Sequence, residues 1–140
     1  MKPIVIDPST AGAWVLPDEV SDAARDLYAQ ACADDGRFHA PQLWLWEMGN
    51  LLVMGHLRKR ISAELVTQGL DVLAATRVNL DPPPSSHRQG QVARLALTHS
   101  LTFYDASYLE LVLRLNGQLA SNDKKLIAAA KACGIVCLIT

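Results

Sequence analysis

The chain has 140 residues, 50% of them hydrophobic, and a formal net charge of -1. This length predicts a single domain over residues 1–140, large enough to bury roughly 68–70% of its unfolded surface. The near-neutral charge excludes a globally basic nucleic-acid binder, so a polyanionic partner would have to be held by a local basic patch or by metal ions.

The sequence predicts a cytoplasmic protein with no membrane association. Only a few apolar residues precede Asp7, too few for the core of a secretory signal peptide, and each later apolar run is shorter than the roughly 18 residues of a membrane span. Cysteine occurs as an odd number of residues without a C-x-x-C pair, at Cys32, Cys133 and Cys137. This pattern predicts free buried thiols rather than disulfides or a zinc site.

The first predicted element is a buried strand over residues 2–6, which are apolar and rich in β-branched side chains. Asp7-Pro8 follows, and Asp at the N-cap with Pro at the first helical position is a preferred helix start. Asp7 taken alone is therefore explained better as a cap than as a catalytic group. The helix should end at Leu16, before Pro17.

A second helix is predicted over residues 18–33, with Asp34-Asp35-Gly36 ending it and a brief strand at residues 37–40. Its inward side chains should be those of Ala23, Leu27, Tyr28 and Ala31.

The next helix, over residues 43–57, is apolar nearly all round, which predicts that it is buried on most sides. Two polar side chains, Glu47 and Asn50, stand three positions apart on one face. An ionised Glu47 in this setting is costly, and no Lys or Arg lies one turn away. Glu47 should therefore bind a distant Arg, emerge at the surface, or be held against a cation.

Three adjacent cations, Arg58, Lys59 and Arg60, close that helix. They suit either a solvated helix end, where positive charge favours the dipole, or contacts to phosphate. A helix over residues 62–76 should follow, with Ser62 as its N-cap, then a strand at 77–80 and a Pro-rich loop at 81–86. Residues 87–100 predict another helix, with His87 and His99 as ordinary surface or capping residues.

The last part of the chain places two acids at the starts of consecutive helices. The apolar spacing from Tyr108 to Leu115 predicts a helix with Asp105 in its first turn, ended by Gly117 in the left-handed conformation. After a short strand at 118–121, Asp123 opens a helix that runs to residue 134, and a final strand covers 135–139. The alternation of strands and helices predicts an α/β fold with a parallel sheet covered on both faces.

The joint arrangement of four acids is harder to explain by helix capping. A parallel sheet can bring residues that follow its strands to one carboxyl edge, where ligands bind. Carboxylates there would repel each other by roughly 3 kcal/mol per pair at ~5 Å and an effective dielectric of ~20. Oxygen ligands without His or Cys favour Mg²⁺ or Mn²⁺ over Zn²⁺. The four candidate metal-binding and catalytic acids are Asp7, Glu47, Asp105 and Asp123.

A cation held in this way can bind a phosphodiester and activate a water, which is the chemistry of a nuclease. Basic side chains would then contact the outer phosphates. The candidates for these contacts are Arg58, Lys59, Arg60, Arg88, Arg94, Lys124 and Lys125.

Three stretches of the chain resemble the PIN-domain ribonucleases, in particular the VapC toxins of bacterial and archaeal toxin–antitoxin pairs. They are the opening IVIDPS, the central P-x-L-x-x-W-E-x-x-N at residues 41–50, and the closing LTFYDASYLELVLRLNGQLASNDKKL. Together they span nearly the whole chain. The closing stretch is the most specific, because a YDASYLELALR-type helix followed by LAT-x-D-x-x-L is a hallmark of these toxins.

The resemblance implies a PIN-like three-layer α/β/α sandwich with a mostly parallel central sheet. It also implies an Mg²⁺- or Mn²⁺-dependent endoribonuclease, usually a homodimer, inhibited by a VapB-type antitoxin whose C-terminal segment crosses the site in a groove lined by the first helices. The family's acidic quartet maps onto Asp7, Glu47, Asp105 and Asp123, and its supporting polar residues map onto Ser9, Asn50 and Ser121. Ser121 replaces the more usual Thr, and Pro8 the more usual Ala or Thr.

Two alternatives remain. A receiver-type phosphoacceptor domain needs an acidic pair near its first strand, a mid-chain Asp that ends the third strand, and a late Lys after a strand. Here Asp7 is followed by Pro, the third predicted strand ends in Asp81-Pro82, and the final strand ends at Thr140, which disfavours this alternative. A PIN fold that binds RNA or a partner without cutting gains nothing from four mutually repelling carboxylates. Candidate dimer surfaces are the helix carrying Trp44 and Trp46, and the face formed by Leu65, Leu70 and Leu73.

Overall fold

Five short strands form one parallel sheet in the computed structural model, which describes residues 1–33 and 36–138. The strands, in chain order, are β1 (Ile4–Ile6), β2 (Phe38–Pro41), β3 (Asn79–Asp81), β4 (Gln118–Ala120) and β5 (Cys137–Leu138). Their order across the sheet is β3-β2-β1-β4-β5, and every pairing is parallel. In the central register, Val5 lies between His39 and Leu119. The carboxyl ends of β1 and β4 therefore lie side by side.

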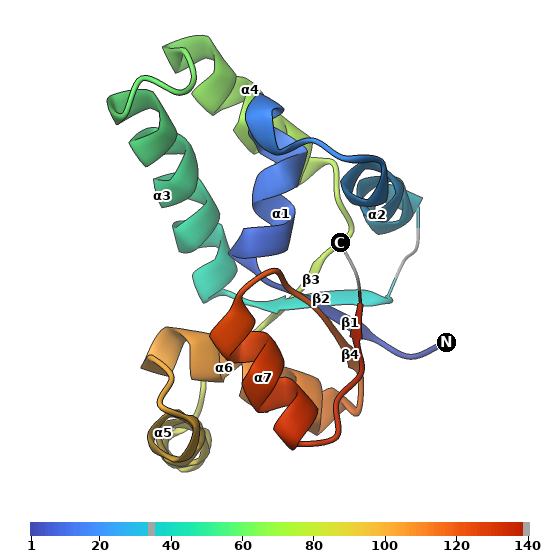
Figure 1. Ribbon diagram of the computed structural model, residues 1–140, viewed down its shortest axis with the longest axis vertical. Helices are drawn as coiled ribbons and strands as arrows, with labels where there is room; N and C mark the ends of the chain where they lie inside the picture. Colours follow the sequence, from blue (N-terminus) through green and yellow to red (C-terminus); the bar gives the residue numbers. More distant parts are fainter. Residues whose placement is uncertain (34–35, 139–140) are drawn as a thin grey trace.

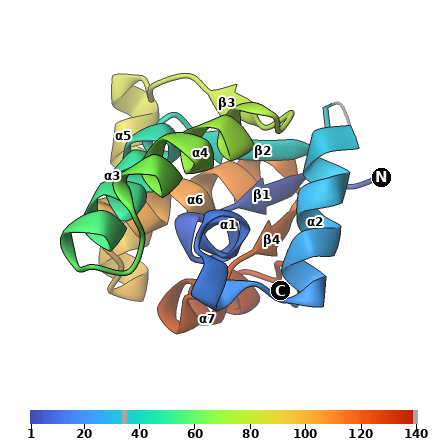
Figure 2. The same cartoon turned by 90° about the horizontal axis from the view of Figure 1, so that it is seen from above.

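Seven α-helices and one 3₁₀ turn connect these strands within the described ranges. They are α1 (Pro8–Val15), η1 (Pro17–Glu19), α2 (Asp22–Ala33), α3 (Leu43–Leu57), α4 (Ala63–Ala74), α5 (Ser86–His99), α6 (Phe103–Leu115) and α7 (Lys124–Ala132). Figure 1 shows α1 to α4 on one side of the sheet and α5 to α7 on the other. Both views show α3, α1 and α2 side by side in that order over the sheet (Figure 2). The predicted three-layer α/β/α sandwich is thus confirmed.

The core lies where β1 meets α6. All three residues of β1 are buried, as expected for the central strand of a parallel sheet. α6 packs against β1 and β2 and buries a nearly continuous run from Tyr108 to Val112. This burial fixes the start of α6, and with it Asp105, against the carboxyl edge of the sheet.

Two predictions about α2 need correction. The predicted helix start at residue 18 is wrong, because Pro17–Glu19 form a separate 3₁₀ turn and α2 begins after Ser21, whose hydroxyl accepts from the Ala24 backbone N–H at 3.1 Å. The inward residue is Ala24, whereas Ala23 is exposed. The terminator proposed at Asp34-Asp35 lies outside the described residues.

The left-handed residue at the end of α6 is Asn116, with φ 50°, and not Gly117. Asn tolerates this conformation because its short side chain bonds locally. Gly117 is required for a different reason: a Cβ at this position would lie 2.6 Å from the carbonyl oxygen of Pro3. The glycine therefore lets β4 pair closely with the residue that precedes β1.

The prediction that α3 is buried on most sides is also wrong. Its buried face consists of Trp44, Met48, Leu52 and Gly55, while Leu45, Trp46, Val53 and Leu57 are exposed. Trp44 is only 2% exposed, so it cannot contribute to the predicted dimer surface as Trp46 can. Leu73 is likewise buried, whereas Leu70 is exposed.

Two further features of the described chain bear on the sequence predictions. The three cysteines are free, as predicted, but each is half-buried rather than fully buried. Within residues 1–33 and 36–138, none of the helices combines the length and the apolar character that crossing a membrane requires.

Candidate active site

Asp7 lies at the junction of β1 and α1 and is both a helix cap and part of a wider network. Its Oδ1 accepts from the Thr10 backbone N–H at 3.2 Å, which is the capping bond that the sequence predicts. The side-chain hydroxyls of Ser9 and Ser121 also donate to it, each at 2.7 Å. Asp7 is 3% exposed, so these donors replace the water that a carboxylate would otherwise bind.

The two serines join the first strand–helix turn to the last one. The Ser9 hydroxyl accepts from the backbone N–H of Asn122 at 2.8 Å, and the Ser121 hydroxyl accepts from that of Asp123 at 3.0 Å. Asp123 in turn caps α7 by accepting from the Leu126 N–H at 2.9 Å. These bonds hold Asp7 and Asp123 at neighbouring strand ends.

Glu47 projects from the second turn of α3, and its partner is Tyr108 rather than a distant Arg. The Tyr108 hydroxyl donates to Glu47 Oε1 at 2.7 Å. Tyr108 lies one turn after Asp105 on α6, so the bond brings the α3 and α6 acids to the same place. Sequence reasoning assigned Tyr108 only to an apolar face. The phenolic hydroxyl, which usually needs a partner when buried, was the signal that could have identified this role.

The four acids are close enough to affect one another electrostatically. Burial raises the pKa of Asp7 above its ordinary value, and the charge of Asp123 adds to the rise, whereas the bonds from Ser121, Ser9 and Thr10 oppose it. Burial likewise raises the pKa of Asp105, and Asp123 again adds to the rise, while the hydrogen bond with Thr102, the N-cap of α6, opposes it.

The pKa of Glu47 is raised in a similar way. Burial raises the pKa of Glu47, the hydrogen bond from Tyr108 lowers it, and the charges of Asp105 and Asp7 raise it further. Burial also raises the pKa of Tyr108, and the neighbouring charge of Glu47 adds to the effect, so the phenol stays protonated and donates. Every one of the four acids is thus coupled electrostatically to another, although two of them lie on the helices α3 and α6 and two follow the strands β1 and β4.

Comparisons with known proteins identify the family. A family profile described as "PIN domain" matches residues 4–132. The chain belongs to the PIN domain family. It is 28% identical over 131 residues to "Ribonuclease VapC3" of Pyrobaculum aerophilum, covering 88% of this chain and 91% of that protein. It also superposes on the crystal structure of PAE2754 from Pyrobaculum aerophilum with a TM-score of 0.71 and 25% identity, covering 97% of this chain and 83% of the other.

The donor set of this PIN domain suits a hard cation, but the side chains do not form a closed cage. In the ranges that the structure describes, no three or more His, Cys, Asp or Glu side chains converge tightly enough to surround a metal ion. Mg²⁺ dehydrates reluctantly and is usually held through one or two carboxylates with several waters retained. Carboxylates that influence one another's charge without converging tightly fit a hydrated ion of this kind better than a four-coordinate zinc.

The predicted supporting residues of the PIN domain divide into two groups. Ser9 and Ser121 bond directly to Asp7, as described above. Asn50 is exposed on α3, and the hydrogen bonds of the described chain include none between Asn50 and the acids. The sequence spacing put Asn50 and Glu47 on one face, but Asn50 lies one turn further from the carboxyl edge.

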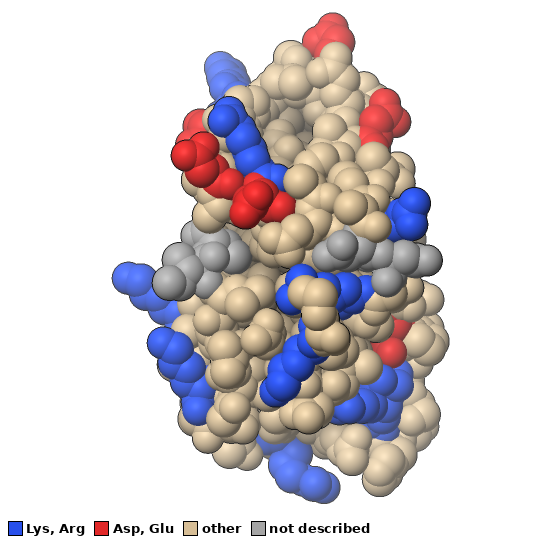
Figure 3. Space-filling view, turned by 90° about the vertical axis from the view of Figure 1, so that its right-hand side faces the viewer, with Lys and Arg blue, Asp and Glu red and all other residues tan. Residues whose placement is uncertain are grey.

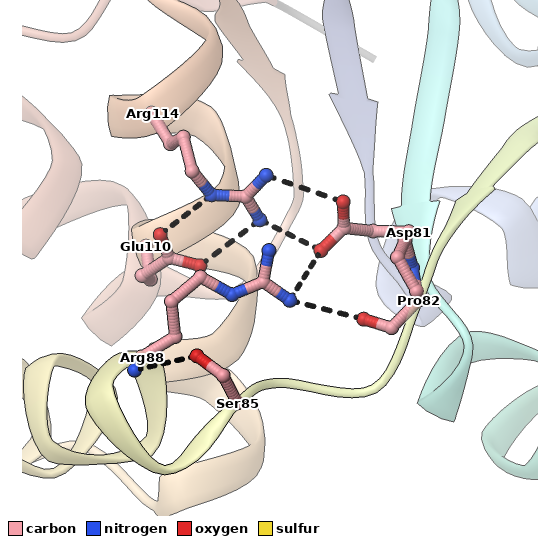
Figure 4. A network of polar contacts seen from close by, with 6 residues as sticks. All are labelled: Asp81, Pro82, Ser85, Arg88, Glu110 and Arg114. Carbon is pink, nitrogen blue, oxygen red and sulfur yellow. Dashed lines mark hydrogen bonds and ion pairs between the residues drawn. The ribbon is translucent and has the colours of Figure 1, made fainter.

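Two of the predicted phosphate contacts, Arg60 and Arg88, form ion pairs with carboxylates of the chain. Arg60 Nη2 lies 2.9 Å from both Asp18 and Glu19, which ties the end of α3 to the 3₁₀ turn. Arg88 Nη2 lies 3.4 Å from Asp81 and donates to the Pro82 carbonyl at 3.1 Å (Figure 4). Both guanidiniums thus already neutralise carboxylates, and their contact with phosphate stays a prediction.

The remaining predicted cations are exposed and stay candidates. They are Arg58, Lys59, Arg94, Lys124 and Lys125. Lys124 and Lys125 begin α7 directly after Asp123 and thus lie near the acids. Figure 3 shows the opposite face, at the amino ends of the strands, where Lys and Arg spread over the lower half and most acidic side chains over the upper half. Charges of both signs are therefore present on this face.

Proposed function

We propose that this chain is an Mg²⁺- or Mn²⁺-dependent endoribonuclease, the toxin of a type II toxin–antitoxin pair. The observation that carries the proposal is the mutual coupling of four carboxylates at the carboxyl edge of the sheet, which is costly in a metal-free protein. The similarity to a protein named Ribonuclease VapC3 supplies the substrate class.

The residues divide the work in the proposed reaction. When bound, Mg²⁺ or Mn²⁺ would lower the pKa of a water and neutralise charge on the phosphodiester. Asp7, fixed by Ser9 and Ser121, and Asp123, fixed by its helix cap, would hold the ion with Asp105. The hydrogen bonds to Asp7 and within the Asp123 cap thus fix the orientation of both carboxylates before an ion would bind.

Glu47 is the candidate proton acceptor. Burial raises its pKa above the ordinary value, which makes the carboxylate a stronger base. The Tyr108 hydroxyl occupies Oε1 and fixes the plane of the carboxylate, and among the described residues Oε2 has no donor. Oε2 can therefore take a proton from the attacking water.

The proposal extends to partners and location. We expect a cytoplasmic homodimer that a VapB-type antitoxin inhibits, as the resemblance implies. The exposed face of α3, with Leu45, Trp46, Val53 and Leu57, offers apolar surface for such contacts. A non-cutting RNA-binding module is the alternative, favoured by the lack of a closed metal cage among the described side chains.

Cleavage of RNA by the purified, partner-free protein tests the proposal. Wild type and Asp105→Asn are incubated with total cellular RNA in Mg²⁺, in Mn²⁺ and in EDTA, with Asp71→Asn, an exposed acid on α4, as the control. We expect cutting at discrete positions by wild type and the control, and none in EDTA or by Asp105→Asn. Equal behaviour of all variants under every metal would leave the non-cutting module as the better account.

A further inference from the structure

A thiol and an imidazole that the proposed chemistry does not use lie beside each other where α7 and α5 end. Cys133 is the C-cap residue of α7, and His99 is the last residue of α5. Cys133 Sγ lies 3.6 Å from His99 Nε2, and both side chains are half-buried. At this distance the imidazole can take the thiol proton directly, which leaves a thiolate, the nucleophilic form of cysteine.

The two helix ends favour a positive charge on the imidazole. The carboxyl end of a helix carries partial negative charge, which stabilises a cation in its last turn. His99 stands at that end of α5 and contacts the residue that caps the same end of α7. The dipole of α7 disfavours an anion at Cys133, so the imidazolium has to compensate for it. Proton transfer from Cys133 to His99 therefore creates an ion pair whose cation is well stabilised.

The two other cysteines are also half-buried, but neither lies beside a base. Cys137 donates to backbone carbonyls, among them that of Ile127 at 3.9 Å, and burial raises the pKa of its thiol. Cys32 lies beside the phenol of Tyr28, whose pKa is raised to about 12, chiefly by burial. A phenol of this kind accepts no proton at neutral pH. Of the three thiols, all within the described ranges, Cys133 is the one next to a side chain that accepts a proton near neutral pH.

A hollow of about 270 Å³ opens beside the thiol and the imidazole. It is lined by His99, Ser100, Lys125, Ala128 and Ala129. Lys125, Ala129 and Cys133 follow one another at intervals of four residues, so they share one face of α7. Lys125 is exposed, and the ion pairs of the described chain include none that uses it. A small molecule joined to Cys133 can therefore occupy the hollow and meet a positive charge at its other end.

We propose that Cys133 is a thiol-modification site that forms mixed disulfides with small disulfides carrying carboxylates. His99 takes the thiol proton, and Cys133 Sγ attacks one sulfur of the disulfide. A new S–S bond forms, the old S–S bond breaks, and the released thiolate takes up the proton from His99. The Cys133 sulfur is oxidised as the released sulfur is reduced, so the disulfide is the only oxidant required.

Lys125 pairs with a carboxylate of the half that stays attached. Cys133 lies at the opposite end of α7 from Asp123, so the modification site is separate from the four acids. Its chemistry does not depend on the proposed ribonuclease function.

Mass spectrometry of the intact, folded chain during incubation with glutathione disulfide tests the site. Wild type, Cys32→Ser and Cys137→Ser should each gain one glutathionyl group first, and Cys133→Ser should gain none over the same interval. In urea the local environment is lost, so all three thiols of wild type should react at similar rates. Earlier modification of Cys32 or Cys137 in the folded chain, or an unchanged rate in Cys133→Ser, would overturn the proposal.

His99→Gln tests the imidazole. With hydroxyethyl disulfide, an uncharged probe, this variant should react roughly threefold more slowly at neutral pH. The effect is modest because a stabilised thiolate is more abundant but intrinsically less nucleophilic. In alkaline buffer a thiol ionises without help, so the variant should match wild type, which a loss of access to Cys133 would not allow. The ultraviolet absorbance of the thiolate at neutral pH should also fall. An unchanged rate and absorbance would refute proton transfer to His99.

Lys125→Gln tests the charge selectivity of the hollow. It should slow the reaction with glutathione disulfide roughly twofold to fivefold, as expected for one exposed ion pair, and leave the reaction with hydroxyethyl disulfide unchanged. Arg77→Gln is the matched control, because it removes the same charge from an exposed position before β3, at the opposite edge of the sheet from β5. It should react like wild type with both probes. Equal slowing by both variants would show that net charge governs the reaction and would refute the role of Lys125.

Discussion

Replacement of Asp7 by Asn separates capping from electrostatic strain. Asn is as good an N-cap as Asp, so the bond from Thr10 survives. The substitution removes repulsion of roughly 3 kcal/mol for a pair at ~5 Å and a dielectric of ~20. It also turns two charge-assisted bonds from Ser9 and Ser121 into neutral ones, which costs about 1–2 kcal/mol each. The metal-free variant should therefore be within about 1 kcal/mol of wild type.

Asp7→Ala is the informative comparison. It removes the cap, at a cost of about 0.5–2 kcal/mol, and leaves the buried Ser121 hydroxyl and the half-buried Ser9 hydroxyl without this acceptor. Urea unfolding in EDTA near neutral pH should rank wild type and Asp7→Asn together, with Asp7→Ala about 3 kcal/mol lower. If Asp7→Asn unfolds as early as Asp7→Ala, the ionised carboxylate stabilises the fold and the strain argument is wrong.

Magnesium should make wild type more stable than Asp7→Asn. A cation that binds only the folded state at about ten times its Kd adds about 1.4 kcal/mol to the unfolding free energy. Wild type should gain this increment in Mg²⁺, and the variant should gain much less because it has lost a ligand. Equal increments for both proteins would show that Asp7 does not hold the ion.

Three other changes test the remaining parts of the account. Tyr108→Phe removes a hydrogen bond that lowers the pKa of Glu47. The acidic limb of the pH–rate profile should therefore move to higher pH. An unmoved limb would exclude Glu47 as the base. Because the pKa values of Asp7 and Asp105 are raised, the folded state keeps protons above pH 3.8, the ordinary pKa of Asp. The metal-free protein should therefore lose stability as the pH rises from 3.8 toward neutral. Rising stability over this range would contradict the coupling. Gly117→Ala should cost about 1–3 kcal/mol in urea unfolding through its clash with Pro3, while Gly90→Ala, with open space inside α5, should cost nothing.

The fold was largely predictable from local patterns. Apolar periodicity and caps such as Ser62 and Asp123 located most helices to within a few residues. The start of α2 was missed because Pro17 begins a 3₁₀ turn whose acids bind Arg60, more than forty positions away in sequence. A pairing of this range leaves no local signal.

The candidate site was predictable in its acids and less so in what surrounds them. Glu47 stood out as a charge in an apolar helix, but its bond to Tyr108 depends on the packing of α3 against α6, which spacing does not define. Nothing in the sequence distinguishes Arg88 from an exposed cation, because its position beside Asp81 appears only in the fold. The exposed face of α3 was missed because a helix that is apolar all round gives no sign of which side lacks a partner.

Binding of Mn²⁺ to the metal-free protein, followed through the electron paramagnetic resonance signal of the free ion, tests most directly whether the four acids act as one metal centre. We expect wild type and Asp71→Asn to remove free Mn²⁺ from solution, and each single amide variant of Asp7, Glu47, Asp105 and Asp123 to do so much more weakly. Equal binding by all variants, or none by wild type, would contradict it and return the four acids to separate structural roles.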